Sequence, residues 1–474
     1  MPEKHSLHQT GVSKKHRTRS DWSFAKSNTS QTLWGPHGYH RYPAKFIPQL
    51  VRQIIEQYSA PGDFVGDTFL GSGTSGVEAL RCNRSFWGID INPIAVFISR
   101  VKCTPIDPQH LEKTWTLISK TIETIPRIGR RFLNEEEKEL IASIDIARAT
   151  SDDRFNYWFP TPHIEILDTL LDIVLAINNR KIRDFFLCAF SNSLRSCSIW
   201  LSGSTKPQKD ISKRLSDPVE RFCLQARDMI RRNRVYWDDI SQVYTDPTEV
   251  SSRFTIARGD ARHLSLTDEQ LDLLVTSSPY ATCYQYLELH QLSQLWFERR
   301  EIIPRVKLQH KCIGGYARQV STPNEISTTS VTADRALVRL ANTVNGDGTN
   351  TVTREVNALR KYFLDMKRVL EESSRVVGKN KYLVMVIGDS IKRGVNIPTS
   401  RVLTELGIQA GFELESKFVR KVAGRVLVAT RDQATGRFSS VAESDTQAYP
   451  QEDVLIFRRR GKPGRKPSLP HESS

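Results

Sequence analysis

Short apolar stretches alternate with longer stretches of helical spacing over most of the chain. Such alternation predicts an open, mostly parallel sheet with helices on both faces, an α/β fold. Strands are predicted at 63–67, 85–91, 381–390, 417–424 and 452–460, and from Phe254 and Leu271 onwards. Helices are predicted from Pro48, at 75–82, at 354–372 and at 398–412.

Two long segments interrupt this alternation. Residues 105–247 have helical spacing with one polar break, which predicts a helical insertion in the α/β core. Residues 281–353 are mixed, and their latter part, 321–351, is rich in Ser, Thr and Asn and is predicted to be loop. The predicted parts are a flexible basic tail (1–30), a first core part (31–104), the insertion (105–247), a second core part (248–457) and a basic tail (458–474).

The charge of the chain indicates a polyanionic partner. Lys and Arg number 68 against 53 Asp and Glu, which gives a formal net charge of +15. Nucleic acid is the favoured partner, with a generic basic surface as the alternative. The seven cysteines form no C-x-x-C pair, which argues against a disulfide framework or a zinc site. Without an apolar run of membrane-spanning length or a signal-like N-terminus, we expect a cytoplasmic protein with no membrane partner.

A glycine-rich turn follows the first predicted strand, in the sequence VGDTFLGSGTSG. Gly71, Gly73 and Gly76 allow a ligand to approach the backbone. Asp67 stands at the strand end, where its carboxylate would repel a pyrophosphate but would suit a positively charged ligand. Asp90 ends the next strand, where a carboxylate can accept hydrogen bonds from ribose hydroxyls. The alternative for Asp90 is a helix cap before Pro93.

These motifs resemble those of a known enzyme family. DTFLGSGT followed by FWGIDINP is similar to the cofactor motifs of S-adenosylmethionine-dependent DNA amino-methyltransferases. Thr68 replaces the proline that is usual in the first of these motifs. The resemblance implies a Rossmann-like class I methyltransferase with a seven-stranded mixed sheet, whose seventh strand is antiparallel, and S-adenosylmethionine as the cofactor. HRYPAKFIP resembles the family segment that closes over the methionine end, and GDAR the motif that contacts adenine. The implied cofactor-binding residues are Lys45, Phe46, Asp67, Phe69, Gly71, Ser72, Gly73, Thr74, Asp90 and Asp260.

The stretch DLLVTSSPY resembles the catalytic motif of the same family. The match assigns catalytic positions to Ser277, Ser278, Pro279 and Tyr280. Ser278 stands where the family usually has a proline, and this is the main departure, because proline stiffens the turn. The implied roles are two hydrogen-bond acceptors, the Ser277 hydroxyl and the Ser278 carbonyl, for the amino group of a base that stacks on Tyr280. The base must first leave the duplex.

The resemblance leaves the target base open. A serine at the first position of the catalytic motif favours the exocyclic N4 of cytosine in double-stranded DNA, and adenine-N6 is the alternative. Further alternatives are an RNA guanine-N2 methyltransferase and an inactive DNA-binding homologue. Carbon-5 methylation is disfavoured because it requires a cysteine nucleophile, and the sequence has no Pro-Cys pair.

The resemblance also implies a role in restriction–modification or defence, with a possible cognate restriction endonuclease as partner. DNA recognition is expected in the insertion and in 281–353, and the C-terminal tail is expected to add affinity in the minor groove. The basic residues singled out for DNA contact are Arg195, Lys206, Lys209, Lys213, Arg214, Arg299, Arg300, Arg305, Lys307 and Lys311.

Overall fold

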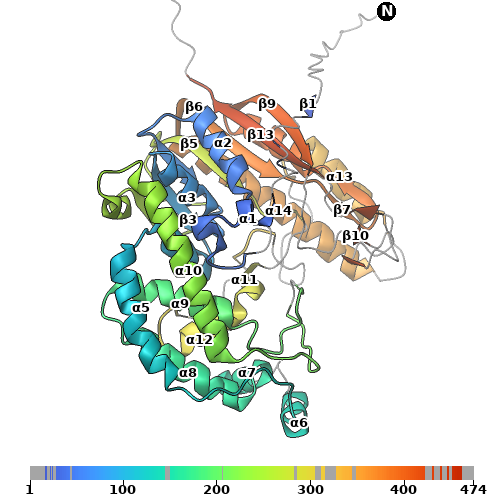
Figure 1. The fold of residues 1–474 in the computed structure, drawn as a ribbon. Helices are drawn as coiled ribbons and strands as arrows, with labels where there is room; N and C mark the ends of the chain where they lie inside the picture. Colours follow the sequence, from blue (N-terminus) through green and yellow to red (C-terminus); the bar gives the residue numbers. More distant parts are fainter. Residues whose placement is uncertain are drawn as a thin grey trace, which may run out of the picture.

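Eight strands form one sheet in the part of the chain that the structure describes (Figure 1). This computed structural model describes residues 17–18, 22, 24, 28–42, 45–144, 150–204, 207–281, 286–304, 311–314, 327–343, 349–421, 430–431, 438–439, 446–447 and 451–461. The strand order is β1-β9-β13-β6-β5-β2-β3-β4. The bounds are β1 Arg17–Thr18, β2 Phe64–Asp67, β3 Ser85–Asp90, β4 Phe254–Arg258, β5 Leu271–Ser277, β6 Val377–Ile387, β9 Phe412–Lys421 and β13 Gln451–Arg459.

The sheet confirms the predicted class I methyltransferase fold. Neighbouring strands from β4 to β6 pair in parallel, and β13 pairs antiparallel with both β6 and β9. The seven longer strands correspond to the seven predicted ones, and the two-residue β1 is added at the edge beside β9. β13 continues to Arg459, so the sheet extends two residues into the predicted C-terminal tail. Residues 462–474 of that tail lie outside the described residues.

Helices cover both faces of the sheet, because successive strand residues point to opposite sides. On one face, Leu383 and Met385 of β6 belong to the same buried cluster as the apolar residues of α13, α14 and α15. On the other face, Val384 and Val386 pack in a cluster with α2 and α3. The helices of the core are α2 Pro48–Tyr58, α3 Thr74–Arg81, α4 Pro93–Cys103, α13 Val331–Ala341, α14 Thr349–Val376 and α15 Thr399–Gln409.

The insertion is helical, as predicted, and forms the lower part of the molecule in Figure 1. It packs around its own hydrophobic cluster, to which α4 of the core contributes Ile94, Ile98 and Val101. Its helices are α5 Pro108–Glu123, α6 Glu135–Ser143, α7 Ser151–Trp158, α8 Thr161–Leu175, α9 Arg180–Ser193 and α10 Pro218–Ser241.

The segment after the catalytic motif belongs structurally to the insertion. It contains α11, Tyr286–Leu289, and α12, Gln291–Arg299. Trp296 of α12 is fully buried and makes edge-to-face contacts with Phe155, Phe159 and Phe190 of the insertion. Two segments that are far apart in the sequence therefore share one core.

The loop predicted at 321–351 is wrong over its second half, where α13 and the start of α14 lie. Ser330 caps α13 by accepting a hydrogen bond from the backbone N–H of Ala333. Ala333, Ala336, Leu337 and Leu340 are buried at helical spacing. The Ser, Thr and Asn content indicated a loop because most of these residues lie in the N-cap of α13 and in the segments before and after it.

Short elements complete the described structure. A hairpin, which the sequence analysis did not predict, joins β7 and β8. The remaining bounds are α1 Thr29–Thr32, η2 Gly35–Gly38, η3 Pro247–Ser252, β7 Ser390–Lys392, β8 Val395–Ile397, β10 Thr430–Arg431, β11 Phe438–Ser439 and β12 Thr446–Gln447.

Candidate active site

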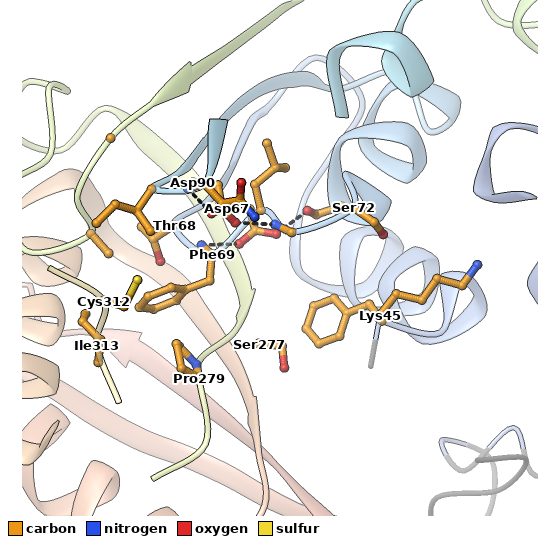
Figure 2. Close-up of a pocket in the computed structure, with 18 of the residues that line it drawn as sticks. Lys45, Asp67, Thr68, Phe69, Ser72, Asp90, Ser277, Pro279, Cys312 and Ile313 are labelled. Atoms are coloured by element: carbon orange, nitrogen blue, oxygen red, sulfur yellow. Dashed lines mark hydrogen bonds between the residues drawn. The ribbon is translucent and has the colours of Figure 1, made fainter. Parts of the chain in front are cut away.

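The predicted acidic and catalytic positions meet at one edge of the sheet. Asp67 ends β2, Asp90 ends β3, and Ser277 ends β5, while Asp260 follows β4 by two residues. Parallel strands bring their carboxyl ends together, so all four residues line one cleft of about 1080 Å³, its open mouth included (Figure 2).

The glycine-rich turn forms one wall of the cleft. Gly71 and Gly73 have φ values of +51° and +79°, and Gly73 is the N-cap of α3. The backbone N–H of Gly71 donates to Asp90 Oδ2 at 2.8 Å, and its carbonyl accepts from Ser99 Oγ at 3.0 Å. The left-handed conformations of Gly71 and Gly73 thus allow the turn to contact both β3 and α4, and the approach of a ligand to its backbone stays a prediction.

Replacing Gly73 with alanine is expected to destabilise the protein by about 3 kcal/mol, as measured by urea denaturation. A Cβ at this position would lie 2.9 Å from both Cβ and Oγ of Ser99, in addition to its left-handed backbone. Gly62→Ala is the matched control, because Gly62 has φ +91° and no atom within 4 Å of the added Cβ. The control should lose only about 1 kcal/mol, and equal losses would contradict the clash at Gly73.

Asp67 connects three elements at the base of the cleft. Its carboxylate accepts hydrogen bonds from the Phe69 backbone N–H at 2.9 Å, from Thr276 Oγ1 of β5 at 2.7 Å and from Ser75 Oγ of α3. Burial raises the pKa of Asp67 to about 6, against the lowering effect of these hydrogen bonds. The contact of Asp67 with a ligand stays a prediction, and its hydrogen bonds between β2, α3 and β5 were not predicted.

Asp90 is not the cap of α4, which was the alternative reading. Asn92 takes that role by accepting from the backbone N–H of Ile94 at 3.0 Å. Asp90 instead accepts from the backbone N–H groups of Gly71 and Asn92, each at 2.8 Å, and lines the cleft. Burial raises its pKa to about 6, and the backbone hydrogen bonds lower it.

Asp260 lines the cleft while it is bound by Arg262. The guanidinium donates from Nε to Oδ1 at 2.9 Å and from Nη2 to Oδ2 at 2.7 Å. Burial raises the pKa of Asp260, but the hydrogen bonds from Arg262 outweigh it and the net pKa is lowered. Arg262 also pairs with Asp365 of α14 at 3.0 Å, so this side of the cleft is fixed to the core.

Lys45 lines the cleft with its stem, and its ammonium points away from Asp67 and Asp90 in Figure 2. Its Nζ donates to the backbone carbonyls of Thr32 and His37 at 3.2 and 3.0 Å. Burial and the nearby charges of other basic residues lower its pKa to about 7. Lys45 therefore fixes the segment that carries it, which is a structural role that the resemblance did not imply.

The catalytic motif contributes two of its four residues to the lining. Ser277 and Pro279 line the cleft opposite the glycine turn (Figure 2). Ser278 is 2% exposed, and its buried Oγ has no hydrogen-bond partner among the described residues. Tyr362 of α14 donates to the Pro279 carbonyl at 2.8 Å and thereby fixes the turn in place of the missing proline.

Tyr280 lies beside this lining rather than in it. Its hydroxyl donates to Glu452 Oε1 of β13 at 2.6 Å, and Arg420 of β9 also binds that carboxylate. Its ring edge lies 3.1 Å from the point that a Cβ on Gly388 would occupy. The β13 carboxylate that orients the tyrosine had no signal in the sequence.

Nine of the ten predicted cofactor residues line the cleft, and the exception, Gly73, shapes the turn from behind. Several other residues also line the cleft and were not predicted from the sequence. Tyr42 lies in the quoted HRYPAKFIP segment, where its aromatic ring was the available signal. Cys312, Ile313 and Gly314 come from variable sequence with no motif, and the rest lie in or beside the motifs themselves: Thr68, Leu70, Ser75, Ile91, Asn92, Gly259 and Ala261.

Several basic residues predicted to contact DNA have other partners. Arg299 and Arg300 pair with Asp168 and Asp172 of α8, the first at 3.3 Å. Lys209 lies 4.3 Å from the centroid of the Tyr157 ring, and Lys311 lines the cleft. Arg195, Lys213 and Arg214 line a second cavity, which is described below. Lys206, Arg305 and Lys307 lie outside the described residues.

The cleft fits a ligand with a sugar, an apolar ring system and a positive charge. Acidic groups stand at three strand ends, and Phe69, Ile91 and Ile313 supply apolar surface between them. A Cβ on Gly71 would stand 3.5 Å from the Tyr42 ring, so the absent side chain leaves room beside the turn. Within the described ranges, no group of three or more His, Cys, Asp or Glu is placed to hold a metal ion. None of the helices described combines the length and hydropathy needed to cross a bilayer.

Comparison with known proteins gives one family match and a set of relatives. A family model described as DNA methylase matches residues 3–99. The type II methyltransferase M.MvaI of Kocuria varians is 24% identical over 421 residues, which cover 85% of this chain and 87% of that protein. M.MjaII of Methanocaldococcus jannaschii is 22% identical over 341 residues, covering 57% of this chain and 63% of that protein.

Solved structures add a weaker likeness. A methyltransferase of Methanosarcina mazei that depends on S-adenosylmethionine matches with a TM-score of 0.28 and 10% identity, covering 86% of this chain and 97% of the other. The fold assignment therefore rests on the strand order and directions described above.

The strand order and the acidic strand ends define a class I methyltransferase. The DNA methylase model covers the part of the chain that holds Asp67, the glycine turn and Asp90, and both relatives are type II methyltransferases. The chain is thus similar to S-adenosylmethionine-dependent DNA methyltransferases, and S-adenosylmethionine is its methyl donor.

Proposed function

We propose that this enzyme methylates the exocyclic N4 of cytosine in double-stranded DNA. The observation that supports this proposal is the position of Ser277 and Pro279, which line the same cleft as Asp67 and Asp90. The cofactor motif and the catalytic motif therefore face one shared space. A serine at the first catalytic position is the feature that favours cytosine over adenine.

The chain supplies two acceptors for the amino group of the base. The conjugated nitrogen is a poor nucleophile, and hydrogen bonds from its two N–H groups localise its lone pair. We assign these bonds to the Ser277 hydroxyl and to the backbone carbonyl of Ser278. The bound donor supplies an electrophilic methyl group on sulfur, and the protein orients the nitrogen toward it. The extruded base stacks on Tyr280, whose hydroxyl is anchored by Glu452.

The cofactor contacts are assigned from the same geometry. Asp90 accepts the ribose hydroxyls, Asp67 faces the ammonium end, and Asp260 lies toward adenine, held by Arg262. Phe46 and Phe69 cover the ligand from two sides, since both line the cleft and pack against the core. Gly71, Ser72 and Thr74 form the turn beneath it.

The biological setting is part of the proposal. Both curated relatives carry the name type II methyltransferase, which supports a role in restriction–modification with a cognate endonuclease. A cytoplasmic location and DNA recognition by the insertion stay predictions.

The target base is tested by transfer of tritium from labelled S-adenosylmethionine to plasmid DNA, followed by digestion to nucleosides. We expect label in N4-methylcytosine. Label in N6-methyladenine would show that the serine at position 277 does not select cytosine. Label in RNA alone, or binding of DNA without transfer by a folded sample, would overturn the proposed function.

A further inference from the structure

A second cavity lies between the insertion and the segment after the catalytic motif. It is lined by the loop that follows α9, by the start of α12 and by His40 and Arg41. None of the described residues that line it is acidic. Its basic lining residues are Arg41, Arg195, Lys213, Arg214 and Arg221. This concentration of positive charge distinguishes it from the acidic first cleft.

His290 lines this cavity and carries a buried donor without a partner among the described residues. Asn92 Oδ1 accepts from the Ile94 backbone N–H, so its Nδ2 is the atom that donates to His290 Nδ1, at 2.9 Å. Burial, and then the charge of Lys102, lower the pKa of His290 to about 4, so the ring is neutral. The proton must therefore reside on Nε2. His290 is 4% exposed, and Nε2 has no hydrogen-bond partner among the described residues.

The cations of the cavity are held in place before any ligand arrives. Arg195 donates to the carbonyls of Leu201 and Ser204, and Lys213 donates to three carbonyls at 2.7–2.9 Å. The Nε atoms of Arg195 and Arg221 are buried without a partner in the described structure. Buried donors without acceptors are uncommon, so the cavity is suited to an anion with several oxygens.

The cavity is adjacent to the active-site cleft. Tyr42 lines the cleft, and its ring centroid lies 5.1 Å from that of His290, which lines the cavity. Asn92 also lines the cleft and hydrogen-bonds the same histidine. The cleft and the cavity therefore meet at a wall to which Tyr42, Asn92 and His290 contribute.

We propose that this cavity binds a backbone phosphodiester of the DNA strand beside the extruded base. The proposal rests on the proposed function, because an extruded nucleotide in the cleft brings its neighbouring phosphates close to Tyr42 and His290. A phosphate supplies negative charge against the basic lining, and it supplies oxygen acceptors for His290 Nε2 and for the Nε atoms of Arg195 and Arg221, which have no partner among the described residues.

The test compares two variants with a matched control. Arg214→Gln removes an exposed cation of the cavity, and His290→Phe removes the buried donor while keeping a ring against Tyr42. Arg335→Gln is the control, an exposed arginine on α13, which packs against α14 and α15 on the far side of the core (Figure 1). DNA binding is measured by fluorescence anisotropy of a labelled plasmid fragment across a salt series.

We expect Arg214→Gln to reduce the slope of log K against log salt by about 1. Both cavity variants should raise KM for DNA about tenfold, and Arg214→Gln should leave kcat and the affinity for S-adenosylmethionine unchanged. The control should match the wild type in all four quantities. Unchanged slope and KM in both cavity variants would overturn the phosphate site.

Two further outcomes separate the explanations. If the wild-type protein binds DNA but transfers no methyl group, the proposed function is wrong. The difference in salt slope between the wild type and Arg214→Gln would still test the phosphate site. If inorganic phosphate raises the melting temperature of the wild type but not of Arg214→Gln, and DNA binding is the same in both, the cavity takes a free anion and the proposal for DNA is wrong.

Discussion

Replacing Ser277 with alanine should lower kcat for methyl transfer by roughly 10²- to 10³-fold, in line with the loss of one oriented polar group at a reacting atom. Ser277 ends β5 and lines the cleft, and its hydroxyl is one of the two acceptors proposed for the base amino group. Affinity for S-adenosylmethionine should not change, because the acidic strand ends are left intact. Single-turnover label transfer and calorimetry measure the two quantities separately.

Ser278→Ala is the matched control for this experiment. The Ser278 hydroxyl is buried without a partner among the described residues, so alanine removes no hydrogen bond and keeps the backbone carbonyl. Activity should be retained, and stability should be equal or up to about 1 kcal/mol greater. Equal losses in the two variants would indicate a general disturbance of the turn, and full activity in Ser277→Ala would remove its catalytic role.

Asp90→Asn is expected to weaken the binding of S-adenosylmethionine by roughly 10- to 100-fold at pH 7.5. The two carboxylate oxygens accept from the backbone N–H groups of Gly71 and Asn92. An amide has one oxygen, so its NH₂ would face one of these donors, and the acceptors proposed for the ribose would be lost. Isothermal calorimetry measures the effect.

The pH dependence of S-adenosylmethionine binding is a second measurement of the role of Asp90. The pKa of Asp90, raised to about 6 by burial, makes the carboxyl mainly ionised at pH 7.5 and mainly protonated at pH 5. Binding that requires the ionised form is therefore strongest above pH 6 and falls by roughly tenfold between pH 7.5 and 5. Asp67, with a pKa also near 6, adds to this fall, so the Asn variant should retain a smaller pH dependence than the wild type.

Asp272→Asn is the control for Asp90→Asn. Asp272 lies near the beginning of β5, at the opposite edge of the sheet from the cleft, and also accepts from a backbone N–H, that of Phe64 at 2.9 Å. Its replacement should leave the affinity for the donor and its pH profile unchanged. The assignment of Asp90 would fail if both variants weakened binding to the same extent.

The strands of the α/β core could be predicted from the sequence more completely than α12, α13 and their packing. The seven longer strands were predictable because strand spacing and chain order fix a parallel sheet, and the sheet in turn fixes which residues share an edge. α13 was missed because its cap and flanks are polar. The packing of α12 with the insertion was missed because no local pattern reports contact between Trp296 and Phe155.

The sequence by itself determined the fold, the glycine turn and the acidic and serine positions at the strand ends, because those depend on local spacing and on residue types. Only the tertiary structure decided which hydrogen-bond partners these side chains have. Asp67 joins three elements, and Glu452 binds Tyr280; both contacts join residues that are distant in the chain. The Lys45 side chain points toward backbone carbonyls, a direction that its position in the sequence does not report. The basic cavity around His290 could not be predicted either. Its residues come from distant parts of the chain, and the hydrogen bond from Asn92 that leaves the proton on His290 Nε2 joins two such parts.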